Sequence, residues 1–162
     1  MKFRFSQASL EDIEELVAIE NRVFTSPWSR KSFEAELQGN EFSLILVARC
    51  EPDTTAASEM SSLTSACGII GYICVWIVFE ELRFMNIAVE IDWRRRGIGS
   101  ALVQHALDAG KKQGAQRALL EVRESNTSAQ ALYVKFGFST YGTRLNYYTN
   151  PNENAMLMAR DS

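Results

Sequence analysis

The chain has 162 residues, of which 46% are hydrophobic and 23% are charged, and these values are typical of one ordinary globular domain spanning residues 1–162. The net charge of −3 argues against a protein that binds nucleic acid through an overall excess of Lys and Arg. Three cysteines and a single histidine, with no CxxC spacing, predict neither a zinc site nor a disulfide framework. We therefore expect no metal and no direct contact with nucleic acid.

The N-terminal segment is acidic and amphipathic, so we expect no signal peptide. The longest apolar run, 69–79, is too short to span a bilayer and is rich in β-branched residues. The sequence therefore predicts a cytoplasmic protein that does not bind a membrane.

The first half of the chain predicts a strand, two helices and two further strands. Ser9 caps the first helix, whose apolar stripe is interrupted by Glu20. Ser29 caps a second, short helix. Trp28, between the two helices, either lines a binding groove or packs the second helix onto the core, and both interpretations stay open. The strands are expected over 2–7, 42–50 and 69–79.

The segment from residue 51 to about residue 67 is low in aromatic residues and rich in Ser, Thr and Ala, so it predicts a flexible hairpin connection. The second half continues with a strand, a helix opened by Gly97, a short strand, a helix capped by Asn126 or Thr127, and a closing hairpin. The expected ranges of these later strands are 82–91, 118–122, 138–147 and 155–160. The order β-α-α-β-β-β-α-β-α-β-β is an α/β arrangement, a mixed sheet with helices on both faces.

A strand, a glycine-rich turn and a helix start follow one another around Arg94-Arg95-Arg96-Gly97-Ile98-Gly99-Ser100. The first amides of a helix lack intrahelical partners and attract anions, so this turn predicts a diphosphate site. An ATP-type phosphate loop would require a Lys that the turn lacks. A dinucleotide fingerprint would need a small residue where Leu102 stands, although Glu121 lies about where its acidic residue is expected.

The same segment resembles the Q/R-x-x-G-x-G/A acetyl-CoA motif of the GNAT N-acetyltransferase superfamily. Further segments resemble one branch of it, the bacterial ribosomal-protein alanine N-acetyltransferases of the RimI type. The resemblance covers nearly the whole chain except the 51–66 segment. The similar segments are Pro27-Trp28-Ser29, Phe84-Met85-Asn86-Ile87-Ala88-Val89, Leu120-Glu121-Val122-Arg123-Glu124-Ser125-Asn126, Ala131-Leu132-Tyr133, Gly137-Phe138 and Asn146-Tyr147-Tyr148.

This resemblance implies a GNAT fold, in which the central sheet splays open and acetyl-CoA lies in the gap as the co-substrate. It implies that strand backbone pairs with the pantetheine arm and that turn amides bind the diphosphate. Asn126 is implied as a further cofactor contact in addition to capping a helix. The implied cofactor-binding residues are Ile87, Ala88, Val89, Arg94, Arg95, Arg96, Gly97, Ile98, Gly99, Ser100 and Asn126.

The resemblance also implies that Glu121 is the general base and Tyr133 the general acid of acetyl transfer. Trp28, Tyr147 and Tyr148 match regions that grip a peptide N-terminus. The implied substrate is the N-terminal alanine of the eighteenth small-subunit ribosomal protein. Independently of the resemblance, we expect a monomer. Two alternatives stay open, namely an acetyltransferase for a different N-terminus, lysine or small-molecule amine, and a CoA-binding module without turnover.

Overall fold

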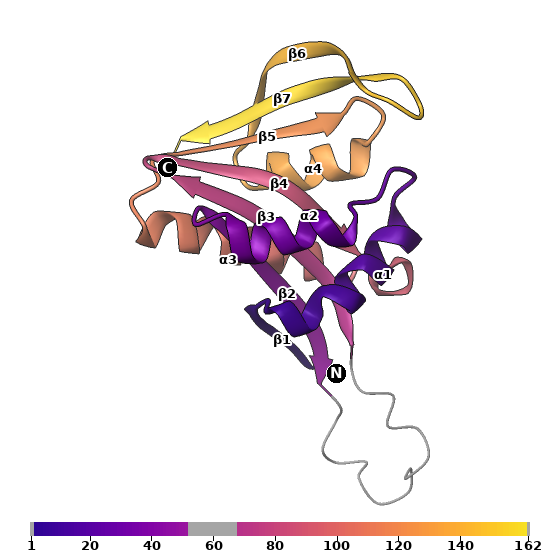
Figure 1. Cartoon of the computed structure of the whole chain (residues 1–162). Helices are drawn as coiled ribbons and strands as arrows, with labels where there is room; N and C mark the ends of the chain where they lie inside the picture. Colours follow the sequence, from indigo (N-terminus) through magenta and orange to yellow (C-terminus); the bar gives the residue numbers. More distant parts are fainter. Residues whose placement is uncertain (1, 52–67, 162) are drawn as a thin grey trace, which may run out of the picture.

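The computed structural model describes residues 2–51 and 68–161. These residues form one seven-stranded sheet with the order β1-β2-β3-β4-β5-β7-β6 (Figure 1). The strands are β1 (Lys2–Gln7), β2 (Ser43–Glu51), β3 (Ile69–Val78), β4 (Glu81–Val89), β5 (Arg117–Arg123), β6 (Ser139–Tyr148) and β7 (Glu153–Asp161). The predicted hairpin connection lies outside the described residues, apart from Glu51, which ends β2.

The helices are α1 (Ile13–Val23), α2 (Arg30–Glu34), α3 (Ile98–Lys112) and α4 (Thr127–Lys135). Three short turns accompany them, two 3-10 turns (Leu10–Asp12 and Ile91–Trp93) and a π-type turn (Ala35–Gly39) that follows α2. The order of strands and helices confirms the predicted α/β arrangement. The strand predicted to reach residue 91 is shorter, because the chain leaves β4 after Val89 and enters the second 3-10 turn.

Two separate hydrophobic cores cover the two faces of the sheet. One core contains Leu16 and Phe33 from α1 and α2, and the other contains Leu102 from α3 and Tyr133 from α4. Strand β3 supplies both cores by alternation, and its residues from Ile69 to Val75 are all buried. A continuous apolar run in the sequence therefore corresponds to a strand that is covered on both sides.

Two of the predicted helix caps, Ser29 and Asn126, are confirmed by their hydrogen bonds; Ser9 instead caps the 3-10 turn Leu10–Asp12, and α1 begins after Asp12. The Ser29 hydroxyl accepts the Ser32 N–H at 3.2 Å, and the Asn126 carbonyl oxygen accepts the Ala129 N–H at 3.2 Å. Side-chain oxygens at these positions satisfy amides that a helix start leaves without partners. The caps thus fix where α2 and α4 begin.

The sheet separates between β4 and β5, its one parallel pair among the described strands. The pairing begins at Glu81 with Arg117 and ends at Phe84 with Leu120. Beyond that point β4 stays paired with β3, whereas β5 stays paired with β7. Met85 is an extra residue in β4, because Phe84 and Asn86 pair with consecutive residues of β3. The bulge lies where the strands part, which confirms the predicted splay.

Candidate active site

The glycine-rich turn leads from β4 into α3 through two residues with left-handed backbone. Arg95 has a φ of 61° and Gly97 a φ of 81°. The Ala101 N–H donates to the Gly97 carbonyl at 3.0 Å and starts the helix, so the amides of the preceding helical residues are those that a helix start leaves unpaired. A Cβ added to Gly97 would meet no atom within 4 Å; the requirement for glycine there is its φ. Such a turn presents amides to an anion.

The arginine side chains before this turn are exposed and two of them contact the protein itself. Arg94 Nε donates to the Val89 carbonyl at 3.1 Å. The Arg96 guanidinium lies over the Trp93 ring at 4.8 Å from its centroid. The Ile98 side chain is buried, so only its backbone is available to a ligand. The turn therefore offers backbone amides within a positive field.

The end of β4 presents a main-chain edge to the splay. Ile87, Ala88 and Val89 pair with β3 on one side, and the described β5 residues pair with β4 only as far as Phe84. The other edge of these three residues therefore faces the gap between the strands. An extended ligand could add to this edge as a further strand does.

Glu121 is the first residue of β5 beyond the end of the β4–β5 pairing. Its Oε1 lies 3.2 Å from Nη1 of Arg144 on β6, and the carboxylate side chain is 32% exposed. The Tyr147 hydroxyl interacts with the same carboxylate, and this hydrogen bond is the main reason that the pKa of Tyr147 is raised. Glu121 thus carries a partly solvated carboxylate at the opening of the sheet.

Tyr133 projects from α4 into the core and is 5% exposed. Its ring packs edge-on against Phe84 and Phe138, with centroid separations of 6.1 and 5.8 Å. Burial, and secondarily the charge on a nearby Tyr148, raise the pKa of Tyr133. The phenol is therefore protonated at neutral pH and is a weaker acid than an exposed tyrosine.

Tyr148 connects the two predicted catalytic residues. Burial, followed by the charges of Glu121 and Tyr147, raises the pKa of Tyr148 to about 12. The charge of Tyr148 in turn contributes to the raised pKa of Tyr133. The rings of Tyr147 and Tyr148 lie 5.0 Å apart. The structure thus brings together the residues predicted as catalytic and two of those predicted to bind substrate.

Two arginines that the sequence interpretation missed belong to this cluster. The Arg144 guanidinium lies 4.9 Å from the centroid of the Tyr147 ring, and that of Arg123 lies 4.4 Å from the centroid of the Tyr148 ring. Arg123 follows Glu121 by two residues, so strand alternation places both on one face of β5. That spacing was the available signal for Arg123, whereas Arg144 lies on another strand and required the pairing of β6.

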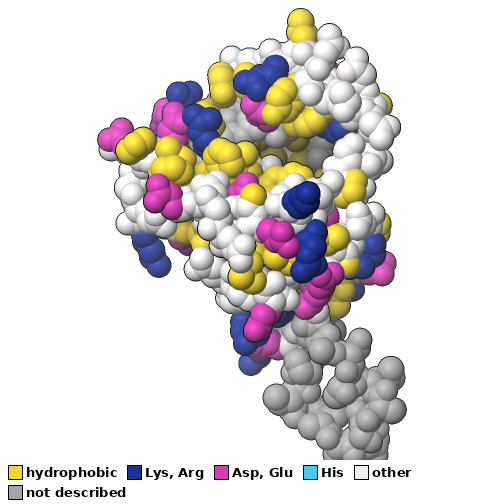
Figure 2. Space-filling view, viewed as in Figure 1, with side chains coloured by type: hydrophobic (Ala, Val, Ile, Leu, Met, Phe, Trp, Pro, Cys, Tyr) yellow, Lys and Arg dark blue, Asp and Glu magenta, His cyan; other side chains and the backbone are white. Residues whose placement is uncertain are grey.

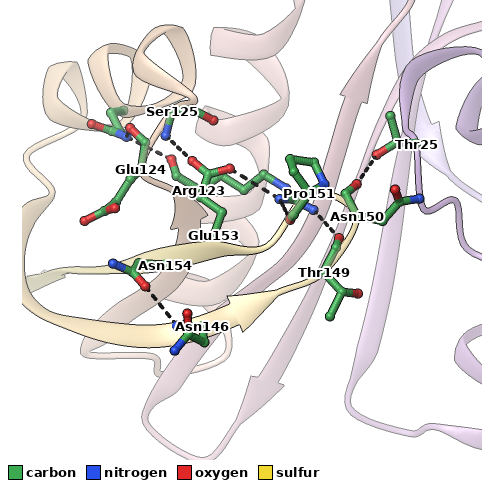
Figure 3. A network of polar contacts seen from close by, with 11 residues as sticks. Thr25, Arg123, Glu124, Ser125, Asn146, Thr149, Asn150, Pro151, Glu153 and Asn154 are labelled. Atoms are coloured by element: carbon green, nitrogen blue, oxygen red, sulfur yellow. Dashed lines mark hydrogen bonds and ion pairs between the residues drawn. The ribbon is translucent and has the colours of Figure 1, made fainter.

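The turn between β6 and β7 is held over the site from two sides (Figure 3). Arg123 donates to the carbonyls of Pro151 at 3.0 Å and Thr149 at 3.1 Å. Across the turn, the Thr25 hydroxyl donates to the Asn150 carbonyl at 3.1 Å. Figure 2 shows the surface hollowed beneath the β6–β7 hairpin. The hollow is therefore bounded by the hairpin and by the segment that joins α1 to α2.

Trp28 lies in that α1–α2 segment and is half-buried. Its ring packs against Phe33 of α2 with centroids 5.5 Å apart, so the packing interpretation is confirmed, while a contact with substrate stays a prediction. Its backbone N–H donates to Glu20 at 3.0 Å. Glu20, which the sequence interpretation treated as an interruption of an apolar stripe, is fully buried.

Two pockets lined by described residues lie away from the opening of the sheet. A pocket of about 180 Å³ lies between α3 and the start of β5, where β4 and β5 are still paired. The described part of the chain contains no group of three or more His, Cys, Asp or Glu that would hold a metal ion. Within residues 2–51 and 68–161, no helix is both long and apolar enough to cross a bilayer.

Comparison with known proteins confirms the resemblance drawn from the sequence. The ribosomal protein bS18-alanine N-acetyltransferase of Escherichia coli (strain K12) is 35% identical over 156 residues, which cover 94% of each chain. A Bacillus subtilis (strain 168) protein provisionally given the same name is 39% identical over 149 residues, covering 92% of this chain and 89% of that protein.

Solved structures agree with this relationship. The crystal structure of the Escherichia coli ribosomal-protein-S18-alanine N-acetyltransferase matches with a TM-score of 0.81 and 30% identity, covering 99% of this chain and 94% of that one. NAA60 of Arabidopsis thaliana in complex with acetyl-CoA shares the fold, with a TM-score of 0.81 and 16% identity over 99% of this chain and 98% of that one. Residues 13–138 match the model of the Acetyltransferase (GNAT) family, and the chain therefore belongs to that family.

Proposed function

We propose that this protein transfers the acetyl group of acetyl-CoA to the N-terminal alanine of ribosomal protein bS18. The observation that carries the proposal is the opening of the sheet after Phe84 and Leu120, with Glu121 at its edge. Relatives that are 39% and 35% identical over most of the chain bear the name of this reaction.

The groups around the splay fit acetyl-CoA mainly through backbone. Ile87, Ala88 and Val89 supply a strand edge that β5 does not cover for the pantetheine arm. The turn from Arg94 to Ser100, with Arg95, Arg96, Gly97, Ile98 and Gly99 between them, supplies amides and positive charge for the diphosphate. Asn126, which caps α4, is proposed as a further contact. Acetyl-CoA supplies the activated thioester carbonyl, and the protein supplies the orientation.

The two predicted catalytic residues suit the proton transfers that this reaction needs. A peptide α-amine has a pKa of about 7.7–8.0, so about a tenth of it is already neutral at pH 7. Glu121 needs only to accept the proton that the amine loses as its C–N bond forms. We assign Tyr133 the role of donating a proton to the departing thiolate, whose basicity resembles that of a cysteine thiol; the phenol is protonated at neutral pH, and its burial makes it a weaker acid than an exposed tyrosine.

Three aromatic side chains, Trp28, Tyr147 and Tyr148, are suited to binding a peptide N-terminus. Tyr147 and Tyr148 lie on β6, and Glu121 contributes to the raised pKa of each phenol. Trp28, in the α1–α2 segment, packs partly against the core. We propose that these three side chains hold the first residues of the acceptor. We further propose that residues 1–162 act as one domain, as a monomer, in the cytoplasm where ribosomal proteins are made.

The direct test measures acetylation of a synthetic peptide that begins Ala-Arg-Tyr, by mass spectrometry with acetyl-CoA as donor. We expect one acetyl group on the α-amine, and none on an N-terminally blocked peptide whose only amine is a lysine. If the peptide is acetylated whatever its first residues are, or only on lysine, the proposed substrate is wrong and the enzyme acts on a different amine.

Two variants test the assigned roles. Glu121→Gln and Tyr133→Phe should each lower kcat by roughly 10²–10⁴, the range for groups that act as a base or an acid, because each removes a proton acceptor or donor. Calorimetric binding of CoA should be nearly unchanged in both. If both variants bind CoA and keep full activity, the assignment of these residues is wrong. If the unaltered protein binds CoA but acetylates no amine, the protein is a CoA-binding module.

A further inference from the structure

A carboxylate is buried where an apolar side chain would be expected. Glu20 on α1 is 1% exposed, and its neighbours along the same stripe, Leu16 and Ile19, are fully buried apolar residues. Burial raises the pKa of Glu20, and three hydrogen bonds to the carboxylate oppose that shift. A buried charge needs such compensation to be tolerated at all.

The hydrogen bonds of Glu20 come from three different elements. Its Oε1 accepts the Trp28 N–H at 3.0 Å and Asn86 Nδ2 at 2.9 Å. The other oxygen accepts the hydroxyl of Tyr72 on β3, and Asn86 Nδ2 also lies 2.8 Å from that hydroxyl. We call Glu20, Tyr72 and Asn86 the carboxylate cluster.

The position of the carboxylate cluster links the two sides of the site. Asn86 follows the bulge residue Met85 and precedes the free edge of β4 that begins at Ile87. Trp28 lies on the acceptor side, in the same segment whose Thr25 contacts the β6–β7 turn. One side chain thereby connects the acceptor segment to the strand that bounds the splay.

Packing alone does not account for a charge at this position. Replacing buried ionic groups by well-packed apolar residues is often neutral or stabilising, and the stripe of α1 already supplies apolar residues on either side of Glu20. What an apolar residue could not supply is an acceptor for the Trp28 amide. An acceptor that holds the Trp28 amide also holds the turn to which it belongs. A displacement of about 1 Å in a segment that positions substrate changes reaction rates strongly.

We propose that Glu20 is a positioning residue that holds the Trp28 turn in place for the peptide acceptor. The inference rests on the proposed peptide substrate and assigns Glu20 no contact with it. The inference predicts an effect on the peptide side of the reaction, where the Trp28 amide lies, because the main chain of β4 keeps its pairing with β3 without Glu20.

The test uses a double variant, Glu20→Leu with Tyr72→Phe, which removes the charge together with the hydroxyl that would lose its acceptor. The KM for the peptide should rise about tenfold, the effect of losing one hydrogen bond to a charged group. The Kd for CoA and the kcat at saturating peptide should stay close to those of the unaltered protein, whereas the melting temperature should fall, because the Trp28 and Asn86 donors lose their acceptors. Glu20→Gln keeps a carbonyl oxygen for the Trp28 N–H, so its KM for the peptide should lie close to that of the unaltered protein.

Asp12→Asn is the matched control, since Asp12 is the other buried acidic side chain among the described residues. It pairs with Arg49 and has no contact with Trp28, so this variant should lose stability without changing KM. A double variant with unchanged KM would overturn the inference. The inference would also be overturned if the KM for the peptide and the Kd for CoA both rose while kcat and the melting temperature both fell, because that pattern indicates a structural role alone.

Hydrogen exchange of the Trp28 amide judges the inference even if no peptide is acetylated. The exchange rate should rise about tenfold or more in the double variant, because the amide loses its charged acceptor, and should stay unchanged in Asp12→Asn. A protein that acetylates no N-terminus would remove the proposed function but keep this exchange pattern. Unchanged exchange in the double variant would refute the role of Glu20 in holding the turn.

Discussion

The two ends of α3 offer a matched pair of glycines for testing the glycine-rich turn. Gly97 stands at the start of the helix with a φ of 81°, and Gly114 follows its end with a φ of 90°. A Cβ at either position would meet no atom within 4 Å. Alanine at either site is therefore opposed by backbone strain alone, without a steric clash.

The expected loss of stability is the same for both substitutions. Placing an L-residue in the left-handed region costs about 1–2 kcal/mol. For a chain of this length, 1 kcal/mol lowers the melting temperature by about 2–4 °C, so each variant should melt about 2–8 °C below the unaltered protein. Calorimetric or spectroscopic melting without ligand measures this loss.

The two variants should differ in their affinity for CoA. Gly97→Ala displaces the amides that we assign to the diphosphate, and the loss of one hydrogen bond to a charged group corresponds to about a tenfold rise in Kd. Gly114→Ala should leave the Kd unchanged. If both variants bind CoA equally well, the turn does not hold the diphosphate, whatever their stability; if both bind it equally badly, the effect is general and our reasoning is wrong.

Two further outcomes follow from the tyrosines and from Arg123. Burial raises the pKa of Tyr133 and, to about 12, that of Tyr148, so the folded protein at pH 10.5 should show less tyrosinate absorbance than the unfolded chain. The stability gained from these phenols is complete below the unfolded pKa of about 10 and should fall as the pH rises toward 12; equal absorbance in both states would contradict this. Arg123→Lys cannot bridge two carbonyls as a guanidinium does, so the amides of Thr149, Asn150 and Asn152 should exchange faster and the peptide KM should rise, with CoA binding unchanged. Unchanged exchange there would refute the anchoring role.

Much of the architecture was predictable because local signals and tertiary packing agree in this chain. Caps at Ser29 and Asn126 and the glycine before α3 mark helix starts by side-chain and backbone chemistry that needs no distant partner. The continuous apolar run of β3 predicted a strand, and the structure shows that it is covered on both faces. These features depend on a few residues close in sequence.

The site was predictable only in part, because several of its contacts join distant segments. Glu121 and Tyr133 were found through family resemblance, whereas the Glu121–Arg144 pair depends on how β6 folds back beside β7. The sequence placed Glu20 on the apolar stripe of the first helix but gave no partner for its carboxylate. Its partners lie 8 to 66 residues away in sequence, and no periodicity reveals such contacts.

The single extra residue in β4 decides which way that strand faces. Leu82 and Phe84, before Met85, contribute to the core under α3 and α4, and after it Asn86 turns toward Glu20 on the opposite side. In an uninterrupted strand, Asn86 would share the face of Phe84, because side chains alternate strictly. The number of residues in β4 before the strands part, and not the side chain of Met85, therefore sets the face to which each later side chain of β4 points. A substitution at Met85 keeps this number, but a deletion there would exchange the two faces of the strand that borders the splay.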